Sequence, residues 1–144
     1  MNELESTISQ VIEENFIPFE WNDKIEKELE EINLDTNLPR KDLTKIPFIT
    51  IDGADAKDFD DAVHCFKNKT TYSLSVAIAD VAEIVKLKSA INDEALERGT
   101  SIYFPSKVIP MLPEKISNNL CSLVPNEIRN VLVCEINFDL EGDL

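Results

Sequence analysis

The chain has 144 residues, 43% of them apolar and only three of them glycine, so it can bury a core of ordinary size. Its formal net charge is −14 with no basic cluster, which argues against a nucleic-acid binder that grips phosphates with a basic face of its own. Three cysteines without CxxC spacing argue against a disulfide framework or a zinc site. With no signal peptide and no stretch near the ~20 apolar residues of a membrane span, we expect a cytoplasmic protein with no membrane partner.

Two helices are predicted at the N-terminus. Residues 2–15 carry apolar side chains at helical intervals, and a second helix is expected from Asp23 to Ile32, with Asn22 as its N-cap. Both are strongly acidic outside their apolar stripes, and a polar segment follows over residues 33–45. We interpret residues 1–45 as a helical connector that supplies no catalytic residue.

From residue 46 the pattern changes to strands. Phe48–Ile51 is typical of a strand, and residues 62–66 are expected to form a strand that pairs across a tight turn with residues 71–78. The second of these alternates cleanly between apolar and small polar side chains. A final strand is predicted over Val131–Phe138, again with alternate apolar positions. The whole pattern predicts an α+β fold, in which N-terminal helices precede a mixed, mainly antiparallel sheet with packed helices.

Further elements lie between these strands. A helix is predicted from Ser89 to Arg98, ended by Gly99, and a short helix around residues 114–119. Between them, Tyr103 and Phe104 begin a proline-punctuated stretch. Aromatic residues beside a single strand of RNA can stack on its bases, but from the residues alone both side chains are better explained as core.

The acidic segment Asp52–Asp61 holds five carboxylates around the single Lys57. Two carboxylates about 4 Å apart repel by ~4 kcal/mol near a protein surface. Such a cluster therefore either points into solvent, protonates in part, or binds a divalent cation that keeps every member ionised. Oxygen ligands suit a hard ion such as Mg²⁺ or Mn²⁺. On the residues alone, a solvated acidic loop and a metal site remain open as alternatives.

The spacing of the acids excludes a calcium-binding EF-hand loop, because no frame places glycine at its sixth position. A helix would align four acids at intervals of three residues on one face: Asp52, Asp55, Asp58 and Asp61. However, Gly53 makes a poor helix start after a strand. We expect instead a turn that joins two strand ends. Since successive strand residues point to opposite faces, Asp60 and Asp61 can serve one metal cluster only if the backbone bends between them.

Several ungapped segments from about residue 45 to the end resemble the catalytic domain of one family. They are Ile49–Gly53 with Asp58–Val63, then Val76–Val81, Arg98–Pro105, Val108–Glu114 and Leu120–Leu123. In this order they resemble the RNB-domain exoribonucleases, the family of ribonuclease R and ribonuclease II, and most closely its ribonuclease R branch. The resemblance predicts that residues 46–144 are the N-terminal part of an RNB catalytic domain.

This resemblance implies a 3′-to-5′ exoribonuclease that hydrolyses single-stranded RNA from its 3′ end to nucleoside 5′-monophosphates. Asp52, Asp58 and Asp61 would hold Mg²⁺, with Mn²⁺ as a possible substitute, and Asp60 would be indispensable for catalysis by orienting a water or the scissile phosphate. Tyr103 matches a tyrosine with which the family holds the terminal nucleotide. Asp55 falls outside the family's four acidic positions.

The resemblance also implies that most of the catalytic domain and the main RNA-gripping surfaces lie in sequence absent here, which would account for the missing basic face. We therefore expect a fragment that is inactive alone, from an enzyme that is monomeric at full length. The alternative is a non-catalytic remnant or interaction module that binds metal, RNA or a protein partner without turnover.

Overall fold

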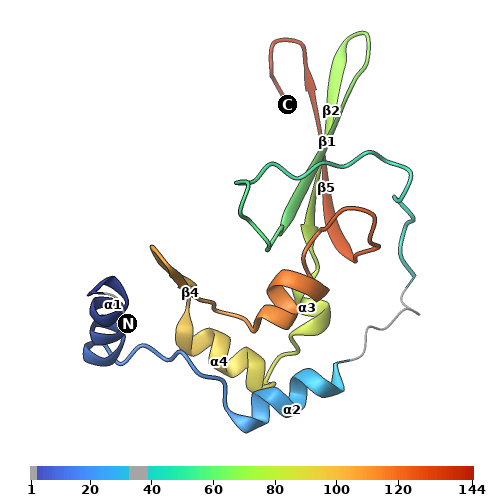
Figure 1. Ribbon diagram of the computed structural model, residues 1–144. Helices are drawn as coiled ribbons and strands as arrows, with labels where there is room; N and C mark the ends of the chain where they lie inside the picture. Colours follow the sequence, from blue (N-terminus) through green and yellow to red (C-terminus); the bar gives the residue numbers. More distant parts are fainter. Residues whose placement is uncertain (1–2, 33–38) are drawn as a thin grey trace. The chain divides into compact units, whose positions relative to one another are not determined.

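The computed structural model describes residues 3–32 and 39–144, which form two compact units. The first combines Met1–Asn33 with Val85–Glu114, and the second combines Leu34–Ile84 with Lys115–Leu144. Figure 1 shows the helices and strands of both. Residues 3–32 and 39–144 contain no helix with the length and hydropathy of a membrane span.

The first unit contains three helices and a short hairpin. Helix α1 (Glu3–Glu14) packs its apolar side against the hairpin of β3 (Ile102–Phe104) and β4 (Lys107–Ile109). Helix α2 (Asp23–Glu31) contacts α4 (Ala90–Arg98), and Glu28 of α2 accepts a hydrogen bond from the first turn of α4 at the Ile91 amide, 3.0 Å away. A carboxylate at a helix N-terminus is favourable because it meets unpaired amides and the positive end of the helix dipole.

The second unit is built on a three-stranded antiparallel sheet in the order β1-β2-β5. Its strands are β1 (Asp61–Lys67), β2 (Thr71–Ala79) and β5 (Val131–Asp139). Short helical segments are α3 (Val81–Ile84) and the π-helical turn η1 (Ile116–Leu120). The register confirms the predicted alternation, because the apolar members of β2 lie directly opposite those of β5. The pairs are Tyr72 with Phe138, Leu74 with Ile136, Val76 with Cys134, and Ile78 with Leu132.

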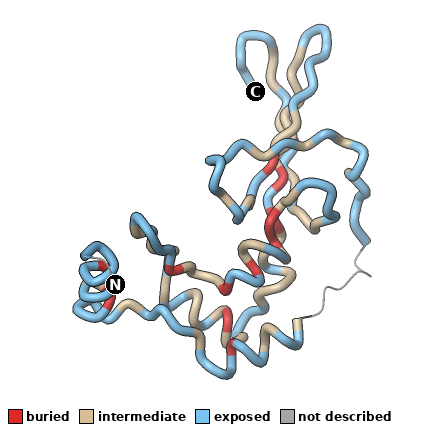
Figure 2. Tube along the Cα trace, in the orientation of Figure 1, coloured by how far each residue is buried: buried red, intermediate tan, exposed pale blue. Residues whose placement is uncertain are grey.

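The buried part of the sheet lies at one of its ends. Ala62, Ala77 and Ala79 are almost fully buried there, while the opposite end, with the β1–β2 turn and the turn after β5, is exposed (Figure 2). Ala62 is the residue directly after the acidic segment. The most deeply buried end of the sheet is therefore the end that is joined to this segment.

The sequence predicted the α+β class and most of the elements correctly. The helices at residues 2–15, 23–32 and 89–98 form within two residues of the expected ends, and Asn22 caps α2 through hydrogen bonds from the Lys24 and Ile25 amides. The strand expected at Phe48–Ile51 is wrong: only Ile49 pairs, in a single bridge with Val63. Part of the predicted connector, residues 33–38, lies outside the described residues, and the division at residue 45 stays a prediction.

Candidate functional site

The acidic segment follows the isolated bridge at Ile49 and leads into β1. Asp52, Asp58 and Asp60 lie outside regular structure, whereas Asp61 is the first residue of β1, opposite Ile78. The strand boundary thus falls between Asp60 and Asp61. The first half of the segment is a turn closed by a 3.0 Å hydrogen bond from the Ala56 amide to the Gly53 carbonyl.

The second half of the segment is held by its backbone. The buried Ser122 hydroxyl donates to the Lys57 carbonyl at 2.7 Å and accepts from the Phe59 amide at 3.1 Å. The Phe59 carbonyl then accepts from the Leu123 amide at 2.8 Å, and the Asp60 carbonyl accepts from the Ala79 amide at 2.9 Å. Two segments distant in sequence, the end of β2 and the loop after η1, therefore fix the path of the chain from residue 57 to residue 60.

The aspartate side chains themselves are left uncommitted. Asp52, Asp58, Asp60 and Asp61 are all exposed, and within residues 3–32 and 39–144 none of these four carboxylates has a hydrogen-bond or ion-pair partner. Elsewhere in the same unit, acids such as Asp80 and Asp139 have partners. The backbone of the acidic segment is ordered by hydrogen bonds that do not use its charges, so the carboxylates stay available to a ligand.

As a donor set, these aspartates fit a hard divalent cation, because they offer only carboxylate oxygens and no histidine or thiolate. In the described part of the chain, no three His, Cys, Asp or Glu side chains converge closely enough to hold an ion. The structure therefore provides ligands of the right chemistry on a fixed backbone, with the side chains spread apart.

Arg129 supports the loop that carries Ser122. Its Nε donates to the Ser122 carbonyl at 3.0 Å and to the Asn119 carbonyl at 3.2 Å. One guanidinium therefore connects the end of η1 and the residues directly after it to the chain before β5. Sequence reasoning gave no role to Ser122 or Arg129. A possible signal was a serine inside the apolar run Leu120–Val124, because a buried hydroxyl requires hydrogen-bond partners.

A network of charged side chains lies just after β2. Arg40 Nη2 contacts the Asp80 carboxylate at 2.8 Å and that of Glu83 at 2.9 Å, and Asn130 donates to the same Glu83 oxygen at 2.7 Å. The side chain of Glu83 is only 4% exposed, and its second oxygen is buried without a partner in the described structure. Arg40 thus neutralises two acids just after β2. In this respect they differ from the four aspartates of the Asp52–Asp61 segment, which have no partner in the described structure.

Tyr103 belongs to the first unit, on the β3–β4 hairpin. The interpretation of Tyr103 as a core residue is wrong, since its side chain is 68% exposed. The neighbouring Phe104 does pack against the cluster around Ile109, as predicted. A strand alternates its faces, so burial of Phe104 in the hairpin requires Tyr103 to face outward.

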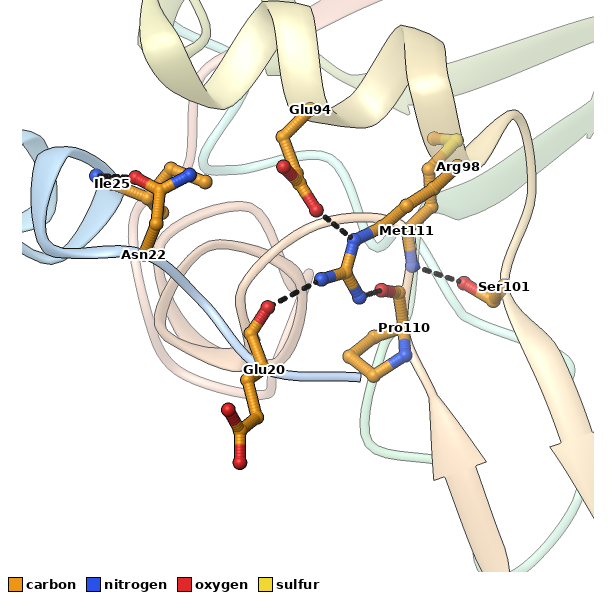
Figure 3. A network of polar contacts seen from close by, with 8 residues as sticks. All are labelled: Glu20, Asn22, Ile25, Glu94, Arg98, Ser101, Pro110 and Met111. Atoms are coloured by element: carbon orange, nitrogen blue, oxygen red, sulfur yellow. Dashed lines mark hydrogen bonds and ion pairs between the residues drawn. The ribbon is translucent and has the colours of Figure 1, made fainter. Parts of the chain in front are cut away.

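Arg98 binds the chain at Pro110, directly after the β3–β4 hairpin (Figure 3). Its guanidinium, 3% exposed as a side chain, donates to Glu94 at 2.9 Å, to the Pro110 carbonyl at 3.1 Å and to the Glu20 carbonyl at 2.9 Å. It also stacks on Trp21, 3.6 Å from the ring centroid. The sequence predicted only that Arg98 is the last residue of its helix, not these contacts with the chain before α2 and after β4.

Comparison with protein families matches residues 40–144 to the RNB domain. The chain is 49% identical over 133 residues to ribonuclease R of Vibrio parahaemolyticus, covering 89% of this chain and 16% of that protein. It is 58% identical over 104 residues to ribonuclease R of Mycoplasmopsis pulmonis, covering 72% of this chain and 14% of the relative.

Among solved structures, RNase R of Mycoplasma genitalium in complex with double-stranded RNA is similar, with a TM-score of 0.92 and 41% identity over 99% of this chain. The match covers 26% of that RNase R chain, so the sequence described here spans only a minor part of the proteins that it resembles. Residues 40–144, which match the RNB domain, include the acidic segment, the Ser122 loop and the β3–β4 hairpin. This chain belongs to the RNB domain family.

Proposed function

We propose that the chain is the opening part of the catalytic domain of a cytoplasmic 3′-to-5′ exoribonuclease, which hydrolyses single-stranded RNA to nucleoside 5′-monophosphates with Mg²⁺. The observation that carries this proposal is the combination found at residues 57–60. Four hydrogen bonds fix the backbone there, and the carboxylates that it presents have no partner in the described structure. A functional site needs ligands that are held in place before binding, and acids kept free on an ordered backbone meet this requirement.

Within this function, Asp52, Asp58 and Asp61 would hold the metal, with Mn²⁺ as a substitute. When bound, Mg²⁺ would supply Lewis-acid chemistry, which offsets the negative charge that develops at the phosphate as water displaces the leaving oxygen in line. Asp60 orients the attacking water or the scissile phosphate through its carboxylate. Tyr103, exposed on its hairpin, holds the terminal nucleotide by stacking.

The remaining RNA-binding surface and the other catalytic groups would come from sequence that the relatives possess and this chain does not cover, since it spans 16% of the Vibrio ribonuclease R. A basic RNA-binding surface outside this chain is consistent with the net charge of the chain itself, which is −14. A strand of phosphates would approach these residues only with metal ions and basic groups from elsewhere to offset repulsion.

The test compares a full-length protein carrying this sequence with variants in the acidic segment. Mg²⁺-dependent release of mononucleotides from labelled single-stranded RNA is expected in the full-length protein and not in the 144-residue chain. Asp60→Asn is expected to lower the rate by about 10³-fold or more, since it removes a group that acts in the transition state. Asp52→Asn is expected to shift the Mg²⁺ dependence to higher concentration.

Asp55→Asn is the matched control, because Asp55 is an equally exposed acid of the same segment outside the four family positions. It removes the same charge and is expected to leave the rate and the Mg²⁺ dependence within about twofold. Full turnover in Asp60→Asn would refute the role of that residue. A full-length protein that bound metal and RNA without releasing nucleotides would favour the non-catalytic module instead.

A further inference from the structure

We propose that Ser122 is a positioning residue for the acidic site, because its hydroxyl fixes the direction in which Asp58 presents its carboxylate. This inference rests on the proposed metal-binding role of Asp58. It adds a residue from a different segment of the chain, 64 positions further on, whose side chain touches neither metal nor RNA in that proposal.

The geometry is specific to the two peptide groups around Asp58. One hydroxyl oxygen contacts both: Ser122 Oγ donates to the carbonyl of the peptide before Asp58 at 2.7 Å and accepts from the amide of the peptide after it at 3.1 Å. Since these two planes meet at the Asp58 Cα, holding both of them fixes the φ and ψ of Asp58. The direction of its Cα–Cβ bond is then set, and only the side-chain torsions stay free.

We call these two hydrogen bonds of Ser122 Oγ, to the Lys57 carbonyl and from the Phe59 amide, the Ser122 bracket. Burial of Ser122 strengthens them. Ser122 is 1% exposed, the only polar residue among the described ones that is buried as a whole, so water cannot replace its contacts. The hydroxyl uses its single hydrogen on the Lys57 carbonyl and a lone pair on the Phe59 amide, so both of its contacts are spent on this segment. The adjacent Leu123 amide extends the hold to the Phe59 carbonyl, at 2.8 Å.

Arg129 holds Ser122 in turn, through the 3.0 Å hydrogen bond from its Nε to the Ser122 carbonyl. The first half of the acidic segment has no comparable bracket. Around Asp52 the only backbone hydrogen bond described is the Ala56–Gly53 turn. Asp58 and Asp60 are therefore held in place before any ligand binds, whereas Asp52 sits on the less restrained half of the segment. Preorganised ligands bind with a smaller entropic cost.

The experiment measures Mn²⁺ affinity by electron paramagnetic resonance, together with amide hydrogen exchange, both on a full-length protein carrying this sequence. Ser122→Ala is expected to speed exchange of the Phe59 amide at least tenfold and to weaken Mn²⁺ binding about tenfold. Ser73→Ala is the matched control: it also removes a hydroxyl hydrogen bond between distant segments of the same unit, to Asn137 at 2.6 Å, but far from Asp58. It should change neither readout. Arg129→Lys, which keeps the charge but not the planar Nε contacts, should have a smaller effect in the same direction.

A double-mutant cycle separates positioning from general loosening. If Ser122 acts through Asp58, Ser122→Ala should weaken Mn²⁺ binding much less in an Asp58→Asn background than in the wild type. Equal weakening in both backgrounds would overturn the inference, as would unchanged Phe59 exchange in Ser122→Ala. Absence of Mn²⁺ binding by the full-length wild-type protein is a different result, because it would overturn the metal proposal itself and the positioning role that depends on it.

Discussion

Arg98 of the first unit and the acidic segment of the second use their charges in opposite ways. In the first, Arg98 is enclosed, and its donors are spent on Glu94, on two backbone carbonyls and on the Trp21 ring. In the second, the acids of the Asp52–Asp61 segment are exposed and without partners in the described structure, while uncharged groups of Ser122, Leu123 and Ala79 hold the backbone beneath them.

This difference distinguishes a structural charge from a charge reserved for a ligand. A buried guanidinium is tolerated only when its donors are satisfied, so Arg98 contributes to the folding of its own unit. Carboxylates whose backbone is ordered by other groups contribute little to folding and can be optimised for binding. The same comparison separates Asp80 and Glu83, which Arg40 neutralises, from the four aspartates of the candidate site.

Arg98→Ala should have the largest effect on stability. The substitution leaves two carbonyls and the Glu94 carboxylate without their donor, and breaking a buried pair of this kind costs about 3–5 kcal/mol. Urea unfolding followed by fluorescence measures this directly, because Trp21 is the only tryptophan of the chain and stacks on Arg98. Lys27→Ala removes an exposed ion pair with Glu31 and should cost less than ~0.5 kcal/mol. Equal costs for both variants would contradict the enclosed role of Arg98.

Cys121 tests the second unit at an enclosed position. Burial, followed by the nearby charge of Asp80, raises the pKa of its thiol from 9.0 to about 11, whereas Cys65 and Cys134 are exposed. At pH 8 the thiolate of Cys121 is therefore about a hundredfold less populated than that of a thiol with a pKa of 9.0. We expect two thiols of the native chain to react quickly with a disulfide reagent and the third only in urea.

The same pKa gives a pH dependence of stability. Because the raised pKa favours the neutral thiol in the folded state, the contribution of Cys121 is fully present below pH 9 and is lost as the pH rises from 9 to about 11. Cys121→Ser should remove this dependence in urea titrations at pH 8 and pH 10.5. In the experiment with the disulfide reagent, equal reaction rates of all three thiols at pH 8 would show that Cys121 is accessible to solvent in the native chain.

Asn22→Ala should lower stability less than Arg98→Ala. The Asn22 side chain caps α2 by accepting from the amides of Lys24 at 3.1 Å and Ile25 at 3.2 Å, and loss of such a cap costs about 1 kcal/mol. Trp21 fluorescence again reports the change, next to the substituted residue. Asn22→Asp keeps the acceptor and should recover most of the loss; a loss as large as that of alanine would show that the cap is not what stabilises α2.

The sequence allowed prediction of much of the fold and of the site's residue types. Helix signals such as Asn22 and Gly99 are local, so α2 and α4 form close to where they were expected. The strand at Phe48–Ile51 failed because an apolar run does not reveal whether a partner strand is available, and here only Ile49 finds one. The interpretation of Tyr103 as core, made from the residues alone, is wrong because residue type does not indicate which face of a short hairpin a side chain occupies. Its role in holding a nucleotide stays a prediction.

By itself, the sequence determined which acids are candidates, since charge repulsion and ligand chemistry follow from residue type and spacing. It also carried the motifs that resemble the RNB family, and the comparison confirmed that membership. Only the tertiary structure revealed how those acids are held. The Ser122 bracket joins residues more than sixty positions apart, and Arg98 joins α4 to the chain before α2. Such contacts arise from the path of the whole chain, because hydrogen-bond geometry is satisfied by proximity in space and leaves no periodic signal in the sequence.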